Sequence, residues 1–82
     1  MMEPKKIIMI GIKQVIRSYQ RIEKAKEEGY YYEEMEHDIE EELMYLRGMA
    51  TALNLSEQLN DREYGEIITK LIPKLRNKYK EQ

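Results

Sequence analysis

The sequence predicts an all-α protein, a three-helix bundle built on a long antiparallel helical hairpin, with the third helix kinked at Pro73. Apolar residues recur at intervals of three and four along most of the chain, which is the period of an amphipathic helix. Of the 82 residues, 37% are charged and 41% are hydrophobic, a composition typical of long helices that still bury a core. Break signals at Gly29 and at residues 54–56 divide a single domain, residues 1–82, into three such segments.

The first helix is expected over about residues 4–28. Pro4 fits the first turn of a helix, where its missing N–H has no partner to lose. Gly29 suits the left-handed conformation that ends many helices. The apolar seam of this helix, meaning the line of apolar residues along one face, has coiled-coil spacing and consists of Ile8, Ile12, Val15, Tyr19 and Ile22.

The second helix is expected over about residues 31–54, after a connection at residues 29–31 that is short enough to make the two helices antiparallel neighbours. Ser56 is expected to cap a short turn after the helix. Gly11 and Gly48 lie inside helices, either as tolerated imperfections or as points of close helix approach. The seam of the second helix consists of Tyr32, Met35, Ile39, Leu43, Leu46, Ala50 and Leu53.

The third helix is expected over about residues 61–80. Asn60 followed by Glu63 matches a capping box at its start. Pro73 removes one backbone hydrogen bond and crowds the carbonyl of Thr69, so the helix is expected to kink there. Its seam consists of Tyr64, Ile68, Leu71, Leu75 and Tyr79.

Size and composition limit how this chain can be stable. Eighty-two residues are near the lower limit for a self-sufficient core, and without cysteine the chain has neither disulfides nor zinc–thiolate sites. Helix packing or self-association must supply the stability, so we expect a homo-oligomer, most simply a dimer. The lack of cysteine favours an intracellular location, and the apolar run over residues 7–12 is too short to span a bilayer. A cytoplasmic protein with no membrane partner is expected.

The charges are segregated along the chain. Residues 27–46 contain nine acidic residues and no lysine or arginine, whereas residues 1–26 contain seven basic residues and two acidic ones. The basic stripe of the first helix lies opposite its seam and consists of Lys6, Lys13, Arg17, Arg21 and Lys24. The acidic face of the second helix consists of Glu33, Glu34, His37 and Glu41. Each is either a solvated surface or a binding surface for a partner of opposite charge.

Some apolar residues lie off the seams, among them Ile7, Ile10, Met44 and Tyr45. A monomeric three-helix bundle would expose them. Singly exposed apolar residues are ordinary, but two hairpins that associate as a four-helix bundle would bury them. We therefore treat these four residues as candidate oligomer contacts.

Three adjacent tyrosines at the predicted hairpin tip, residues 30–32, are the most distinctive local feature. Tyrosine is enriched at binding hot spots, and it also stacks on bases. One or two of these rings are expected to cap the end of the core, while at least one, Tyr31, is expected to stay exposed. Tyr30 and Tyr31 are candidate partner-binding residues together with the acidic face.

No residue pattern indicates catalysis, a metal or a cofactor. Glu34 and His37 have the Glu-x-x-His spacing of di-iron bundles, but those sites need two such motifs that point inward. Ser18 and Ser56 are the only serines, neither has a plausible histidine partner, and the glycines are too scattered for a phosphate loop. We therefore expect a protein that is not an enzyme and that carries neither metal nor cofactor.

Three segments of the chain resemble the N-terminal helical region of RinA-type phage transcription regulators. They are residues 12–28 (IKQVIRSYQRIEKAKEE), 38–53 (DIEEELMYLRGMATAL) and 65–75 (GEIITKLIPKL). The matching residues are Leu46, Arg47, Met49, Ala50 and Thr51, then Glu66, Ile67, Ile68, Lys70 and Leu71. The resemblance implies a phage or mobile-element regulator without the helix-turn-helix of that family, which leaves an oligomerisation or protein-binding module.

Two functional hypotheses follow. The first is a small non-enzymatic regulatory protein that binds an unidentified protein partner through the acidic second helix and the tyrosine tip. The second is a nucleic-acid-binding protein that uses the basic stripe of the first helix. The net charge of −2 and the absence of a base-reading motif favour the first.

Overall fold

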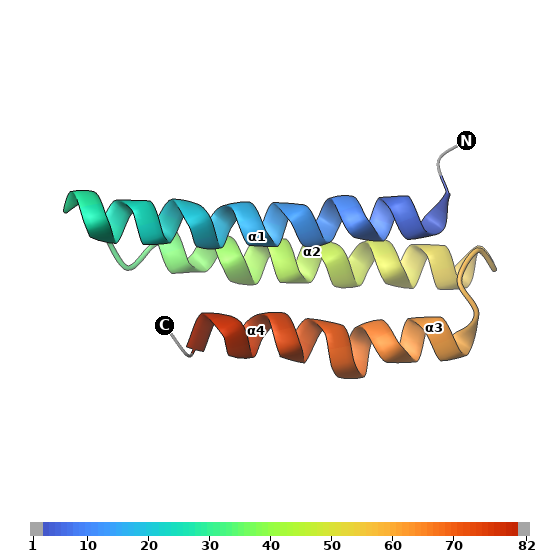
Figure 1. The fold of residues 1–82 in the computed structure, drawn as a ribbon. Helices are drawn as coiled ribbons and strands as arrows, with labels where there is room; N and C mark the ends of the chain where they lie inside the picture. The colour runs from blue at the N-terminus through green and yellow to red at the C-terminus, as the bar shows by residue number, and fades with distance from the viewer. Residues whose placement is uncertain (1–2, 81–82) are drawn as a thin grey trace.

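The computed structural model describes residues 3–80, with side chains through residue 78, and these residues form the predicted all-α bundle. α1 and α2 make an antiparallel hairpin, and the third helix, residues 61–80, runs back along α2 (Figure 1). The bundle is elongated, with extents of 45 × 25 × 15 Å. The elements are α1 (Pro4–Glu28), α2 (Met35–Leu55), α3 (Asp61–Glu66), η1 (Ile67–Leu71) and α4 (Ile72–Lys80), the last three forming the third helix.

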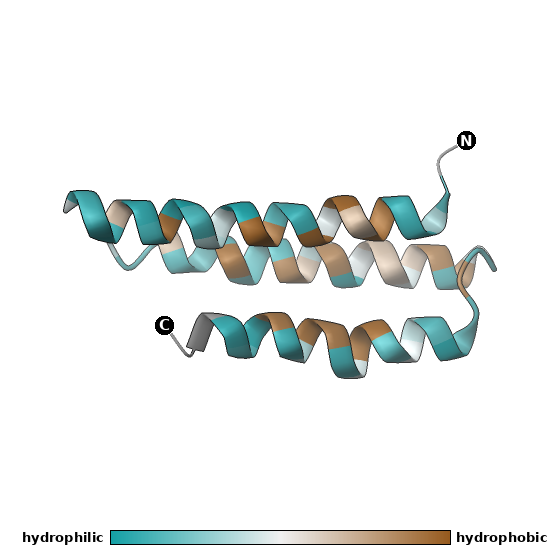
Figure 2. Cartoon of the chain, viewed as in Figure 1, coloured by the Kyte–Doolittle hydropathy of each residue, from teal (hydrophilic) through white to brown (hydrophobic). Residues whose placement is uncertain are grey.

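The core lies where the three helices meet, and their most hydrophobic sides face inward (Figure 2). The predicted seams supply most of it: Ile8, Val15, Tyr19, Ile22, Ile39, Leu43, Leu46, Ala50, Leu53 and Leu75 are buried. Leu59 and Ile72 are also buried, although neither belongs to a predicted seam. Leu59 lies in the connection before α3, so helical spacing could not assign it to the core. The side chain of Tyr79 lies outside the described residues.

Gly11 allows α1 and α2 to approach closely. A Cβ atom at this position would lie 2.7 Å from Cε of Met49 and 2.8 Å from Cδ1 of Leu46. Gly48 differs, because a Cβ atom there would meet nothing within 4 Å. Of the two interpretations of these glycines, close approach therefore applies to Gly11 and not to Gly48.

The hairpin tip is longer than predicted, because α2 begins at Met35 rather than near residue 31. Gly29 ends α1 with φ 81°, as expected, but residues 30–34 then form the connection. Tyr32, predicted to lie in the α2 seam, is 57% exposed instead. No Ser, Thr, Asp or Asn precedes this helix, and Glu34 at its N-cap makes no capping hydrogen bond. The sequence therefore contains no side-chain cap that would mark where this helix begins.

The end of α2 is close to the prediction, but Ser56 has a different role. Its Oγ donates to the carbonyl of Leu53 (3.2 Å), so it belongs to the end of α2 and caps no new turn. The N–H of Gln58 bonds to that same carbonyl, and Glu57 adopts the left-handed φ of 65°. This is a Schellman-type ending with glutamate in the position that glycine usually takes.

The third helix begins as predicted, and its hydrogen bonding changes immediately before Pro73, where the kink was expected. Asn60 and Glu63 form the full capping box, with bonds of 2.8 and 3.1 Å. Immediately before Pro73 the helix widens into one π-helical turn, η1, in which the N–H of Ile72 bonds to the carbonyl of Ile67. A proline ring at residue 73 crowds the carbonyl four residues earlier, and a π-turn is one of the ways a helix accommodates such a conflict.

Candidate interaction surfaces

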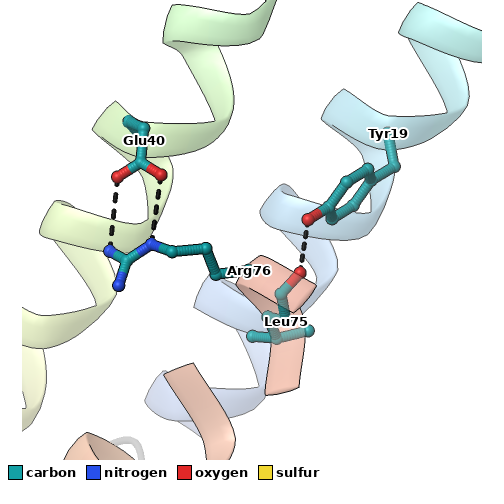
Figure 3. Close-up of polar contacts among 4 residues, drawn as sticks. All are labelled: Tyr19, Glu40, Leu75 and Arg76. Atoms are coloured by element: carbon teal, nitrogen blue, oxygen red, sulfur yellow. Dashed lines mark hydrogen bonds and ion pairs between the residues drawn. The ribbon is translucent and has the colours of Figure 1, made fainter. Parts of the chain in front are cut away.

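The third helix covers one side of the hairpin through polar contacts as well as through the core. The buried hydroxyl of Tyr19 in α1 donates to the carbonyl of Leu75 in α4 (Figure 3). Arg76 donates two hydrogen bonds to the carboxylate of Glu40 in α2, at 3.1 and 3.3 Å. These contacts show which edges of α1 and α2 face the third helix.

The opposite side of the hairpin, which we call the rear face, is not covered by the third helix. On α1, helical spacing of about 100° per residue puts Ile10, Arg17 and Arg21 roughly opposite Tyr19. On α2, the same spacing puts Tyr45 and Met49 roughly opposite Glu40. The rear face and the adjoining outer face of α2 contain most of the predicted site residues.

The predicted acidic face of α2 is solvent-exposed. Glu33 lies in the tip, while Glu34, His37 and Glu41 follow at and beyond the start of α2, and all four are exposed. Among the described side chains, those of residues 3–78, Glu34 and Glu41 form no ion pair, in contrast to Glu40 with Arg76. The charge of these two carboxylates is therefore available to a partner.

An apolar patch continues from this acidic face toward the C-terminal end of α2. Met44 and Tyr45, predicted as oligomer contacts, are 70% and 72% exposed. A shallow groove is lined here by Glu41, Met44, Tyr45, Gly48, Met49 and Ala52. The last three were not predicted. Two features of the sequence could have indicated them: their helical spacing from Tyr45, and the absence of a side chain at Gly48.

The predicted basic stripe is exposed along the outer face of α1, at Lys6, Lys13, Arg17, Arg21 and Lys24. A second shallow hollow is lined by Gln14, Arg17, Gln20, Arg21 and Lys24. Arg21 donates a hydrogen bond of 3.3 Å to the buried Ser18 hydroxyl. Among the described residues, the other four bases of the stripe make no ion pair.

The two apolar residues predicted as oligomer contacts on α1 differ in exposure. Ile10 is 46% exposed and lies on the rear face. Ile7 is half-buried and packs against the core. The expectation that Ile7 would be exposed is therefore wrong, because it lies one helical turn before Gly11, where α1 and α2 approach closely.

At the tip, the expectation that a tyrosine remains exposed is confirmed, but the residue is different. Tyr30 and Tyr32 are exposed, whereas Tyr31 is half-buried and packs against the core. The ammonium group of Lys26 lies 4.9 Å from the centroid of the Tyr31 ring, within the range of a cation–π contact. A hydrogen bond to Glu36, together with desolvation and the charges of Glu36 and Glu33, raises the pKa of Tyr31 to about 12. Tyr31 thus anchors the tip and orients its two neighbours outward.

A second groove, which the sequence did not predict, lies between α1 and the third helix. Its apolar lining is Ile8, Met9, Ile12, Leu59, Ile67 and Leu71. Lys5, Glu63, Glu66, Lys70 and Lys74 also line it, so both signs of charge are represented. The sequence placed Ile8, Ile12 and Leu71 in core seams. The groove exists because α1 and the third helix each pack mainly on α2.

Metal-binding geometry and membrane-spanning helices are both absent from the part of the chain that the structure describes. No group of three or more His, Asp or Glu side chains there could hold a metal ion. None of the helices described combines the length and apolar character needed to cross a bilayer. Comparison with known proteins finds no matching family model, curated protein or solved structure.

Proposed function

We propose that this chain is a small, non-enzymatic regulatory protein that binds another protein through the exposed face of α2 and the tyrosine tip. The supporting observation is that one face of α2 carries carboxylates without an ion-pair partner at one end and the exposed side chains of Met44 and Tyr45 at the other. Exposed apolar patches rimmed by polar residues mark protein-binding sites. Tyr30 and Tyr32 extend this surface at the acidic end.

The chemistry of this face suits a basic amphipathic helix. Met44 and Tyr45 would contact the apolar side of such a helix, and the groove at Gly48 has room for an inserted side chain. Lysine or arginine residues of the partner would face Glu34 and Glu41. Opposite charges increase the rate of association and select the orientation, while the apolar contacts supply most of the affinity.

A pull-down experiment tests this function. The tagged protein, immobilised and exposed to a lysate that lacks it, should retain a protein partner identified by mass spectrometry. The variant Glu34→Lys/Glu41→Lys and the variant Met44→Ser/Tyr45→Ser should each lose that partner. Lys74→Glu/Lys78→Glu, which alters exposed residues of α4, is the matched control and should retain it. Equal capture by all four proteins would reject the assignment of this surface.

A second candidate function is nucleic-acid binding through the basic stripe. The observation that favours it is the run of exposed, unpaired bases on the outer face of α1. A gel-shift series at low salt tests it. Binding that weakens steeply with added salt and is lost in Lys13→Glu/Arg17→Glu would support this function. No shift at about 10 µM protein would exclude specific affinity of the usual strength.

The setting of this function is also a proposal. The resemblance to RinA-type regulators supports a phage or mobile-element origin and a cytoplasmic location. The matching segments fall in α1, α2 and the third helix, so the similarity concerns the helical part of those regulators. A transcription assay on promoters that RinA-type regulators control, with and without this protein, would test a regulatory role.

A further inference from the structure

We infer that the rear face of the hairpin docks onto the rear face of a second copy, in a dimer whose two-fold axis runs parallel to the helices. This inference goes beyond the proposed function, because it assigns the rear face and the adjoining part of the α2 face to a second copy of the chain. It goes beyond self-association in general, since it assigns the direction of the two hairpins and the residues that face one another.

The first step is the alignment of α1 with α2. Gly11 lies against Leu46 and Met49, and the two helices are antiparallel. Residues whose numbers add up to about 58 therefore lie at the same height along the hairpin, since each helix rises about 1.5 Å per residue. Ile10 then lies level with Gly48, and Arg17 lies level with Glu41.

The second step is the pattern on the rear face at these heights. Near the open end of the hairpin it is apolar on both helices, with Ile10 on α1 beside Tyr45 and Met49 on α2. Toward the tip it is charged, with bases on α1 and acids on α2. The levels that carry opposite charges are Arg17 with Glu41, Arg21 with Asp38, and Lys24 with Glu34.

The third step is symmetry. A two-fold axis that lies in the interface and runs along the helices places α1 of each copy over α2 of the other, at the same height. Ile10 then meets the Tyr45–Met49 patch of the second copy, and Arg17 meets its Glu41. Every contact occurs twice, as an isologous interface requires. The four helices form a bundle, and the two tyrosine tips lie side by side at one end.

Other arrangements of the same surfaces match less well. A two-fold axis across the helices would place α1 over α1 and α2 over α2. The bases would then approach bases and the acids approach acids, and like charges at an interface disfavour association. An open-ended contact of α1 on α2 would produce a filament. Charge complementarity therefore selects the parallel dimer.

The charged groups concerned have no competing partner within the copy. Among the side chains that the structure describes, Arg17, Lys24, Glu34, Asp38 and Glu41 form no ion pair, although bases and acids lie on neighbouring helices. Arg21 makes one hydrogen bond, to Ser18. Dimerisation would supply partners to both signs at once and would cover apolar side chains that are now exposed.

Charge reversal with rescue is the main test. Size-exclusion chromatography with light scattering should give about twice the monomer mass of 9.9 kDa at concentrations of ~10–200 µM. Arg17→Glu/Arg21→Glu and Asp38→Arg/Glu41→Arg should each weaken dimerisation about tenfold or more. The two variants mixed together should associate again, because each then meets opposite charges. Lys74→Glu/Lys78→Glu is the control and should dimerise normally. Circular dichroism on every variant establishes that it is folded.

Engineered cysteines test the direction of the hairpins, since the natural chain has none. A chain with Arg17→Cys mixed with one carrying Glu41→Cys should form the mixed disulfide on mild oxidation. Arg17→Cys alone should form little disulfide, because in this arrangement the two copies of α1 do not face each other. Dominant self-linking of Arg17→Cys would overturn the arrangement, as would a monomer throughout the concentration series.

The two proposals can fail separately. A monomeric protein that still captures a partner from lysate through Met44 and Tyr45 would reject the dimer and retain the proposed function. A dimer with the predicted cross-link that captures nothing would show that the face serves self-association alone, which supports this inference and rejects a separate partner on that face.

Discussion

The two sides of the hairpin use the same two helices in different ways. On the side of the third helix, polar groups are paired: Tyr19 with the carbonyl of Leu75, Glu40 with Arg76 and Thr51 with Tyr64. On the rear face and the adjoining outer face of α2, Arg17 and Glu41 carry charges without an ion-pair partner among the described residues.

The difference shows that the charge of a side chain does not by itself indicate whether that side chain holds the fold together or borders an exposed surface. Glu40 and Glu41 are neighbours in the sequence, yet Glu40 holds the third helix and Glu41 borders the exposed groove. One residue corresponds to about 100° of rotation around a helix, which is enough to move a side chain from the side of the third helix to the outer face of α2. Stability should therefore depend on the covered side, and association on the rear face.

Removing the end of the third helix should have the largest effect on stability. A chain truncated after Ile72 loses the buried Leu75, the carbonyl that accepts from Tyr19, and the Arg76–Glu40 pair. The loss of one buried leucine and of one buried hydrogen bond should together lower the free energy of unfolding by about 3–4 kcal/mol. Thermal denaturation followed by circular dichroism measures it. A melting temperature equal to that of the full chain would show that α4 contributes nothing to the fold.

A core leucine and an exposed methionine on α2 offer a matched pair. Leu46→Ala should lower the free energy of unfolding by about 3 kcal/mol, because Leu46 is fully buried and contacts α1 at Gly11. Met44→Ala, two residues earlier and exposed, should change it by no more than about 0.5 kcal/mol. Urea denaturation at a low protein concentration, where any dimer is dissociated, compares them. Similar losses would contradict the distinction between the two sides.

Two tyrosines allow a smaller and more specific comparison. Tyr19→Phe removes the hydroxyl that bonds to the Leu75 carbonyl and should cost about 1 kcal/mol of unfolding free energy. Tyr45→Phe removes a hydroxyl from an exposed ring and should leave the stability unchanged within error. Urea denaturation again provides the measurement. If Tyr19→Phe is neutral, the α1–α4 contact is not a determinant of stability.

The smallest expected effect concerns the pH dependence at the tip. The pKa of Tyr31 rises from 10.0 to about 12 on folding, so the folded protein resists ionisation of this phenol. The stabilising contribution is present below pH 10 and is lost as the pH rises toward about 12. An ultraviolet titration of the tyrosines should show one phenol that ionises at higher pH than the others. Tyr31→Phe should remove this high-pH transition, and Glu36→Gln should shift it to lower pH. If the high-pH transition remains in Tyr31→Phe, it belongs to another tyrosine.

Much of the fold could be read from periodicity. Apolar spacing located three helices and most of the core, and local signals identified Pro4, Gly29 and the Asn60–Glu63 capping box. The kink at Pro73 was predictable because it follows from the missing N–H and the bulk of the ring. These features depend on residues within a few positions of one another, and the sequence displays such relationships directly.

The candidate site was predictable only in part, because exposure depends on how helices pack. Helical spacing showed that Met44, Tyr45 and the charged residues point away from the seams. It could not show that Ile7 packs against the core or that Tyr31, rather than its neighbours, anchors the tip. Nor could it show the groove between α1 and the third helix, which arises from the way both pack on α2.

The sequence by itself determined the helices, their seams and the segregation of charge, since these follow from local propensity and spacing. Only the tertiary structure decided where α2 begins, that Glu40 and not Glu41 pairs with Arg76, and which side of the hairpin the third helix covers. The reason is that an apolar seam specifies only which face of its own helix turns toward the core. The placement of a second and third helix also depends on small residues such as Gly11 and on distant polar partners, which no local pattern contains.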